Sequence, residues 1–349
     1  MVRKISRRDF LKGAAVTGAG IYGAAILPIE SNAASKPPKS RLVIVNSPNV
    51  FTTSTQTTVS TDMTSIGSSD TSINQSVLNS MISQGIRAFT GKKSDADAWK
   101  KLFKPSDVVG IKVNSFCGRD ASTHPEVVAP VIAGLKLAGV KEESIIVWEW
   151  QDRHLISGGF RVNRTDEGFL CYGTENEFEE QTTTVGSISG RLSKILTQKI
   201  TALINIPILK EHCEAGVSCA MKNHYGSIHN PGDYHGNNCN PFIAEVNSIP
   251  AIKNKTRLII CDALKPLANG GPNFNSEFVW EYRSIHIGAD PVAFDFLGWQ
   301  VIDARRKEIG LPTLADAGRP PKWLATAASM DLGTNDPARM EIIRKTVTG

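Results

Sequence analysis

Short apolar runs alternate with segments of helical periodicity along most of the chain. Runs rich in Val, Ile and Leu predict buried strands at residues 41–46, 108–114, 144–150, 202–208 and 256–261. Apolar positions recur at helical spacing over residues 74–89, 125–137 and 290–306, and Pro125 suits a first helical turn. This alternation predicts an α/β fold, with a mostly parallel sheet flanked by helices.

Weaker patterns suggest the remaining elements. Residues 52–71 are dominated by Ser and Thr, which predicts a long polar loop. Residues 215–225 follow a strand and a loop and predict a short helix, whereas residues 321–330 and 337–345 predict two closing helices. We expect residues 34–349 to form a single large domain.

The N-terminus differs from the rest of the chain. Arg7 and Arg8 precede a Gly/Ala-rich apolar run at residues 13–27, and small residues follow it. Paired arginines, a short apolar run and a small-residue cleavage site are typical of a twin-arginine signal, here residues 1–33. The run is too short for a stable membrane anchor. We therefore expect export by the twin-arginine translocase to a periplasmic or extracellular location.

Charge and cysteine content narrow the classes of function. The net charge is +5, most of it contributed by residues 1–33, and no basic stripe interleaved with aromatic residues remains. Nucleic acid is therefore not an expected partner. The six cysteines form no C-x-x-C, C-x-x-C-H or ferredoxin-like run, so we expect neither an iron–sulfur cluster nor c-type haem. Export leaves disulfide pairing among Cys213, Cys219 and Cys239 open.

Polar side chains follow four of the predicted strands at their carboxyl ends. They are Lys112, Asn114, Glu149, Asp152, Lys210, His212 and Asp262. Because the carboxyl ends of parallel strands face a common crevice, we expect these residues to surround one site. Polar strand ends also arise wherever a chain turns back at the surface, but we favour the site. Further along, Asp290 is expected to cap a helix, and Asp295 lies among apolar residues.

Residues 211–239 concentrate groups that bind metals or move protons. Four of the seven histidines and three of the six cysteines lie there: His212, Cys213, Cys219, His224, His229, His235 and Cys239. The spacing matches no zinc-finger template and no H-E-x-x-H motif. A turn at residues 231–232 nevertheless allows four ligands to converge on a metal ion: His212, His224, His235 and Cys239. The alternative is that residues 229–239 form a loop that only covers the cleft.

Several segments resemble, in order, the family called domain of unknown function 362. They read GIKVN at residues 110–114, THPEVVAPVIAGLKLAGV at 123–140, LINIPILKEHCEAGVSCAMKNHYGSI at 203–228, ICDALKPLANGGP at 260–272 and HIGADPVAFDFLGWQVI at 286–302. The resemblance extends over about residues 107–309. Some members of that family carry a ferredoxin-like cluster module, and this chain lacks its cysteine runs.

These residues predict an exported enzyme that acts on a small anionic molecule. The candidate catalytic residues are Lys222, His224 and His212, and the candidate substrate-binding residues are Lys112, Asn114, Lys210 and Asp262. Acid–base chemistry of the lyase or isomerase type needs only such groups, whereas an oxidoreductase needs a bound cofactor or metal. The alternative is an exported metal- or small-ligand-binding protein that uses the same cluster without catalysis.

Overall fold

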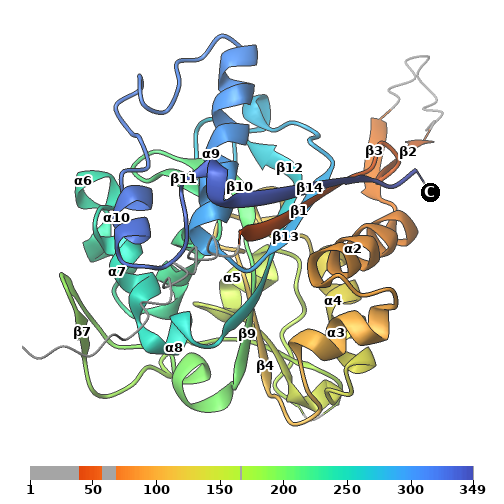
Figure 1. Ribbon diagram of the computed structural model, residues 1–349, viewed down its shortest axis with the longest axis horizontal. Helices are drawn as coiled ribbons and strands as arrows, with labels where there is room; N and C mark the ends of the chain where they lie inside the picture. Colours follow the sequence, from red (N-terminus) through yellow and green to blue (C-terminus); the bar gives the residue numbers. More distant parts are fainter. Residues whose placement is uncertain (1–38, 57–67, 166, 349) are drawn as a thin grey trace, which may run out of the picture. The chain divides into compact units, whose positions relative to one another are not determined.

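A mostly parallel sheet forms the centre of the computed structural model, which describes residues 39–56, 68–165 and 167–348 (Figure 1). In chain order its strands are β1 (Ser40–Asn46), β4 (Val109–Val113), β5 (Ile145–Glu149), β6 (Leu170–Gly173), β9 (Ala202–Ile206), β10 (Ile208–His212), β11 (Gly216–Ser218), β12 (Thr256–Leu267), β13 (Ser284–Gly288) and β14 (Met340–Thr346). Their spatial order is β14-β1-β13-β12-β9-β4-β5-β6, with β10 beside β12 and β11 beside β10. Strands β13 and β11 run antiparallel to their neighbours, and the other pairs are parallel.

The five strands predicted from the sequence all belong to this one sheet, as β1, β4, β5, β9 and β12. Every residue of β4, β5 and β9 is buried, which explains why these strands are mostly apolar, each with one polar residue: Lys112, Glu149 and Asn205. The predicted α/β fold with a single sheet flanked by helices is therefore confirmed.

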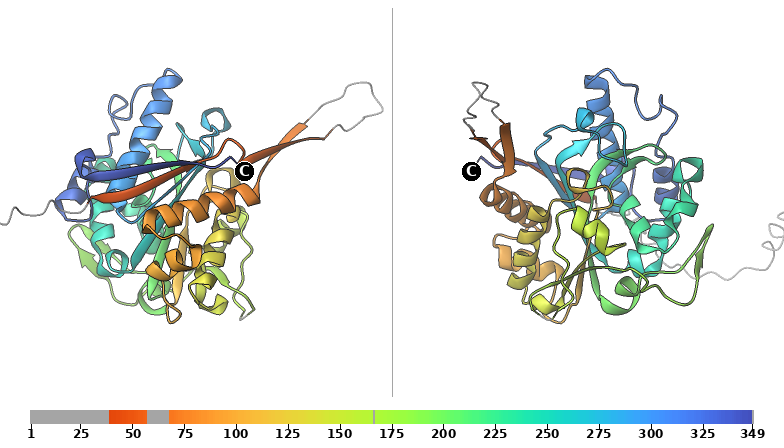
Figure 2. Two further views of the ribbon diagram at one scale, coloured as in Figure 1. Left: turned by 45° about the vertical axis from the view of Figure 1, so that its right-hand side comes forward. Right: turned by 180° about the vertical axis from the view of Figure 1, so that it is seen from behind.

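Helices cover both faces of the sheet, as the views in Figure 2 show. One face packs against α2 (Gln75–Thr90), α3 (Asp95–Leu102) and α4 (Pro125–Leu137), and the other against α7 (Phe242–Ser248), α9 (Pro291–Glu308) and α10 (Trp323–Ser329). Alternate residues of a strand point to opposite faces, so β1 contributes Leu42 and Ile44 to one core and Val43 and Val45 to the other. The shorter helices are α5 (Asp152–Ser157), α6 (Gly236–Cys239) and α8 (Pro250–Lys253).

Helix starts follow the capping pattern of the sequence. The side chain of Asn74 accepts a hydrogen bond from the backbone N–H of Val77 at the start of α2. The predicted cap Asp290 does the same for Ala293 at the start of α9. The predicted helices at residues 74–89, 125–137, 290–306 and 321–330 correspond to α2, α4, α9 and α10. No helix among the residues described here is long and apolar enough to cross a membrane.

Two expected features differ from the sequence prediction because tertiary pairing outweighs local pattern. Residues 340–346, expected to be helical, form β14 and pair in parallel with β1. The segment expected to be a polar loop at residues 52–71 contains β2 (Phe51–Gln56) and β3 (Ser68–Ile73), which pair as an antiparallel hairpin. A second hairpin joins β7 (Thr183–Val185) to β8 (Ile188–Gly190). The middle of the 52–71 segment and the predicted signal lie outside the described residues.

The predicted helix at residues 215–225 is also wrong. Its first part is β11, and a 3₁₀ helix follows at Lys222–Ser227. Gly216 has a φ of 78°, which is incompatible with an α-helix. The carboxylate of Asp295 on α9 accepts the backbone N–H groups of Ala220 and Met221, at 2.7 and 2.9 Å. These bonds fix the turn that leads into Lys222.

Candidate functional site

A cavity of about 150 Å³ lies where β4, β5 and β10 end, at the edge of the sheet that the sequence predicted. We refer to it as the lysine cavity. Its polar lining consists of Asn114, Cys117, Glu149, Lys210, His212, Ser218, Lys222, Asn223, Tyr225 and His235. Phe116, Trp150, Pro231 and Pro272 add apolar surface.

Lys112 lies directly beneath this cavity and is fully buried. Its Nζ atom is 2.8 Å from Oε1 of Glu149, and it also donates to the carbonyl oxygen of Val113 at 2.7 Å and to Oδ1 of Asn223 at 3.3 Å. Burial lowers the pKa of Lys112, and the charge of Glu149 opposes that effect. All three donors of the ammonium group are used, so Lys112 supports the cavity floor rather than lining it.

Lys210 and Lys222 enter the cavity from two different elements. Nζ of Lys210 donates to Oδ1 of Asn114 at 3.3 Å and to the carbonyl of Ala121 at 3.1 Å. Nζ of Lys222 lies 3.0 Å from Nε2 of His235 and 3.6 Å from the ring centre of Tyr225. Within the described ranges, no carboxylate approaches either ammonium group to salt-bridge distance. The two cations differ in this respect from Lys112.

Burial sets the protonation of these groups. It lowers the pKa of Lys210, and it lowers the pKa of Lys222 to about 8. The positive charge of Lys210 contributes to the second effect, whereas Glu214 opposes it. Lys222 is therefore poised to gain or lose a proton near neutral pH, unlike an ordinary surface lysine.

The two histidines of the cavity stack on each other, with ring centres 5.6 Å apart. Nδ1 of His212 accepts from the backbone N–H groups of Glu214 and Ala215, at 3.2 and 3.3 Å, which assigns the ring proton to Nε2. Burial, with the charges of Lys222 and His235, lowers the pKa of His212 to about 2. His212 is thus a neutral N–H donor rather than a cation.

His235 is oriented so that its ring accepts a hydrogen bond from the ammonium group of Lys222. Its Nδ1 atom lies 3.4 Å from the carbonyl oxygen of Gly232, which assigns the ring proton to Nδ1. Its Nε2 atom is then an acceptor for the ammonium group of Lys222. Burial and the charge of Lys222 lower the pKa of His235.

Two of the predicted site residues lie elsewhere. His224 faces a separate cavity of about 220 Å³, with its Nε2 atom 3.3 Å from Nδ2 of Asn205. Residues two apart on a 3₁₀ helix point about 120° away from each other, and Lys222 and His224 accordingly line different cavities. Asp262 is fully buried and bonds to His124, whose side chain lines a different cavity. The predicted grouping of His224 and Asp262 with the lysines is therefore corrected.

The predicted four-residue metal set does not converge. His224 is turned away, and Sγ of Cys239 lies against the carbonyl oxygen of His235 at 3.7 Å. In the part of the chain that the structure describes, one trio has ligand atoms within 4.8 Å of one another: His212, Cys213 and Glu214. The last two are exposed, and Nδ1 of His212 already accepts two backbone bonds. This geometry does not support a metal centre.

The six cysteines, all within the described residues, are free thiols, so the disulfides left open by the sequence are not formed. His229 accepts a hydrogen bond from the backbone of Arg191 and does not line the lysine cavity.

Some residues of the site were missed by sequence reasoning. Asn223 holds the cavity floor together, since it contacts Lys112 and donates to Oδ1 of Asn205 at 2.7 Å. Cys117 and Tyr225 line the wall. Asn223 and Tyr225 are close to Lys222 in the sequence, and Cys117 is close to Asn114. Nearness in sequence to a predicted site residue was therefore the one feature that could have identified them.

Comparisons with known proteins assign this region to a family. Residues 109–300 match the family model described as domain of unknown function (DUF362), and residues 4–21 match the model of the twin-arginine translocation pathway signal sequence. Comparison with curated proteins gives no match. One similar solved structure is a crystal structure of a protein from Thermotoga maritima, with 12% identity and a TM-score of 0.45. That similarity covers 66% of this chain and 59% of the other.

Proposed function

Because the chain belongs to the family of domain of unknown function 362 and carries a twin-arginine export signal, we propose that it is an exported enzyme acting on a small anionic molecule in the lysine cavity. The observation that carries the proposal is the pair of buried lysines, Lys210 and Lys222, which have no carboxylate partner among the described residues. The cavity volume of about 150 Å³ equals that of roughly five water molecules, so the ligand is small.

Electrostatics favours an anion as the missing partner. Removing an ammonium group from water is costly unless an opposite charge compensates it. Glu149 supplies that charge to Lys112 at 2.8 Å, whereas no carboxylate of a described residue lies within salt-bridge distance of Lys210 or Lys222. Glu149 and Glu214 act on these two ammonium groups only from a longer distance. A carboxylate or phosphate between the two ammonium groups would form charge-assisted hydrogen bonds with both.

The surrounding groups are suited to acid–base chemistry. With a pKa of about 8, Lys222 is partly neutral near physiological pH. Where Lys210 and His212 hold the carboxylate of a substrate, the neutral amine of Lys222 can take a proton from the adjacent carbon. The resulting ammonium group donates to His235. Lys210 and the Nε2–H group of His212 face the same space and would stabilise the negative charge that develops on the carboxylate. The reaction class is therefore a proton transfer of the lyase or isomerase type.

A binding experiment with proton exchange tests this function. Mature protein is titrated by calorimetry with oxalate and lactate, and exchange of the lactate α-proton is followed by NMR in D₂O. We expect Lys210→Met and Lys222→Met to lose binding, because each removes one cation from the cavity. Lys100→Met, at an exposed position of α3, is the matched control and should bind normally.

The outcomes separate the two functions considered. Binding accompanied by α-proton exchange that Lys222→Met abolishes supports the enzyme. Binding of these anions without exchange of any α-proton supports the non-catalytic carrier instead. Unchanged affinity in Lys210→Met would refute anion binding at this cavity.

A further inference from the structure

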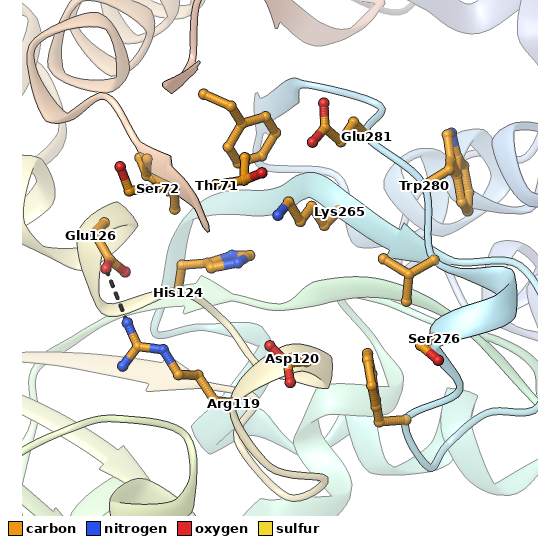
Figure 3. A pocket seen from close by; sticks show the side chains of 14 residues that line it. Thr71, Ser72, Arg119, Asp120, His124, Glu126, Lys265, Ser276, Trp280 and Glu281 are labelled. Atoms are coloured by element: carbon orange, nitrogen blue, oxygen red, sulfur yellow. Dashed lines mark hydrogen bonds and ion pairs between the residues drawn. The ribbon is translucent and has the colours of Figure 1, made fainter. Parts of the chain in front are cut away.

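A second and larger cavity, of about 630 Å³, borders the same loop that walls the lysine cavity (Figure 3). We refer to it as the histidine cavity. Asn114, Phe116 and Cys117 of the loop line the lysine cavity. Arg119, Asp120 and His124 line the histidine cavity. The remaining walls are contributed by the β2–β3 hairpin, the start of α4, β12 and the segment of residues 274–281.

A histidine–aspartate pair lies at the inner wall of this cavity. Nδ1 of His124 is 2.7 Å from Oδ2 of Asp262, which is fully buried. The same oxygen accepts the backbone N–H of His124 at 2.8 Å, and Oδ1 accepts the N–H of Leu264 at 3.1 Å. With three donors directed at it, the carboxylate holds the His124 proton at Nδ1. No hydrogen bond from a described residue reaches Nε2, the nitrogen left for a ligand.

Several charged groups act on the pKa of His124. Burial acts to lower the pKa of His124, but the charge and hydrogen bond of Asp262 outweigh it and raise that pKa. Glu126 acts in the same direction as Asp262, and Lys265 acts against it. Glu126 is itself engaged by Arg119 at 3.3 Å.

Lys265 supplies an available cation in this cavity. Its Nζ atom lies 4.7 Å from the ring centre of Phe51, and no carboxylate of a described residue reaches it at salt-bridge distance. Asp120 and Glu281 also line the cavity, as separate acidic groups. Figure 3 shows the side chains of Lys265 and His124 extending into the same space.

Aromatic side chains also line this cavity. Phe51, Phe274 and Trp280 all line the cavity, and Phe274 is 42% exposed. Exposed aromatic surface next to an unpaired cation is a common feature of sites for ring-bearing anions. The volume is about four times that of the lysine cavity, which is enough for such a ligand.

We propose that the histidine cavity is a second ligand site, which binds an aromatic compound carrying a carboxylate or phosphate group. The anionic group lies between Nε2 of His124 and Nζ of Lys265, and the ring packs on Phe274 and Trp280. This site is independent of the lysine cavity, because the two are lined by different side chains.

Calorimetric titration with three probes tests the proposal: phenyl phosphate, inorganic phosphate and phenol. In the wild-type protein we expect phenyl phosphate to bind about tenfold more tightly than either of the others, since only it engages both halves of the site. Lys265→Met should weaken phenyl phosphate binding about tenfold through the lost charge-assisted bond. Phe274→Ala should weaken it about three- to tenfold while leaving phosphate binding unchanged.

Control variants distinguish phenyl phosphate binding in the histidine cavity from anion binding in the lysine cavity. Lys222→Met should bind phenyl phosphate like the wild type, and thermal unfolding should show that Lys265→Met and Phe274→Ala are folded. Benzoate in place of phenyl phosphate distinguishes a carboxylate from a phosphate preference. The proposal is overturned if phenyl phosphate binds no better than phosphate, or if binding is lost in Lys222→Met but retained in Lys265→Met.

Discussion

Anion binding in the lysine cavity should weaken as the solution becomes alkaline, because Lys222 loses its charge. Burial depresses the pKa of this lysine from 10.5 to about 8. The ammonium form therefore predominates below that value, and the neutral amine predominates above it. If only the ammonium form binds, the apparent dissociation constant rises about tenfold between about pH 7 and about pH 9. A lysine with an ordinary pKa would leave the affinity nearly constant over that range.

Calorimetry with oxalate measures this effect directly, since the charge of oxalate is constant in this range. Titrations at about pH 8 in two buffers of different ionisation enthalpy should also show uptake of about half a proton per anion bound, because the bound anion raises the pKa of Lys222. Cys117→Ser removes a thiol that lines the same cavity and should leave the pH profile unchanged. Lys222→Met should bind weakly at every pH.

One result would refute the reasoning. If the wild-type affinity for oxalate is the same at about pH 7 and about pH 9, Lys222 either keeps its ordinary pKa or does not contact the anion. The position of the cavity at the carboxyl ends of the strands would then not be sufficient to identify it as the anion site.

Three further predictions concern stability and export. Glu149→Gln leaves the buried ammonium group of Lys112 without a countercharge and should lower the free energy of unfolding by about 3–5 kcal/mol in urea denaturation. A double variant that also carries Lys112→Met should recover most of that loss, and an equal loss in both would contradict the pairing. Lys222→Met should raise the free energy of unfolding near neutral pH by about 2–3 kcal/mol, because it removes a buried charge whose pKa is lowered to about 8; a lower thermal midpoint would argue against this. Replacing Arg7 and Arg8 with Lys should leave uncleaved precursor in the cytoplasm, and normal processing seen in cell fractions would exclude the twin-arginine route.

Local pattern predicted the central strands well and the edge of the sheet poorly. Strand β9 is buried on both faces, and its sequence is a short, mostly apolar run that is typical of a central strand of a parallel sheet. Strand β14 is largely exposed, and its two adjacent isoleucines, flanked by charged residues, lack the strict alternation of a half-buried strand and also fit a helix. Its strand conformation depends on pairing with β1, a contact that local sequence does not contain.

The candidate site was predictable as far as strand ends determine it. Lys210 and His212 lie in β10, near its carboxyl end. The rule that carboxyl ends of parallel strands face a common crevice was therefore sufficient to place them near Asn114. His224 was misplaced because its direction depends on the 3₁₀ geometry of Lys222–Ser227. The partnership of Asp262 with His124 depends on how α4 begins relative to β12, and no sequence spacing specifies that. The catalytic roles of these residues stay predictions.

The place of β1 in the sheet determines when this protein can be exported. It is the first described strand, yet its two neighbours are β13 and β14, at residues 284–288 and 340–346. During synthesis the ribosome releases β1 long before either neighbour exists, so Leu42 to Val45, fully buried in the finished fold, must wait in contact with solvent or chaperones. The twin-arginine translocase accepts folded cargo. We therefore expect the signal, although it emerges first, to be used only after β14 has been made and has paired with β1, which would couple departure from the cytoplasm to the pairing of this edge strand.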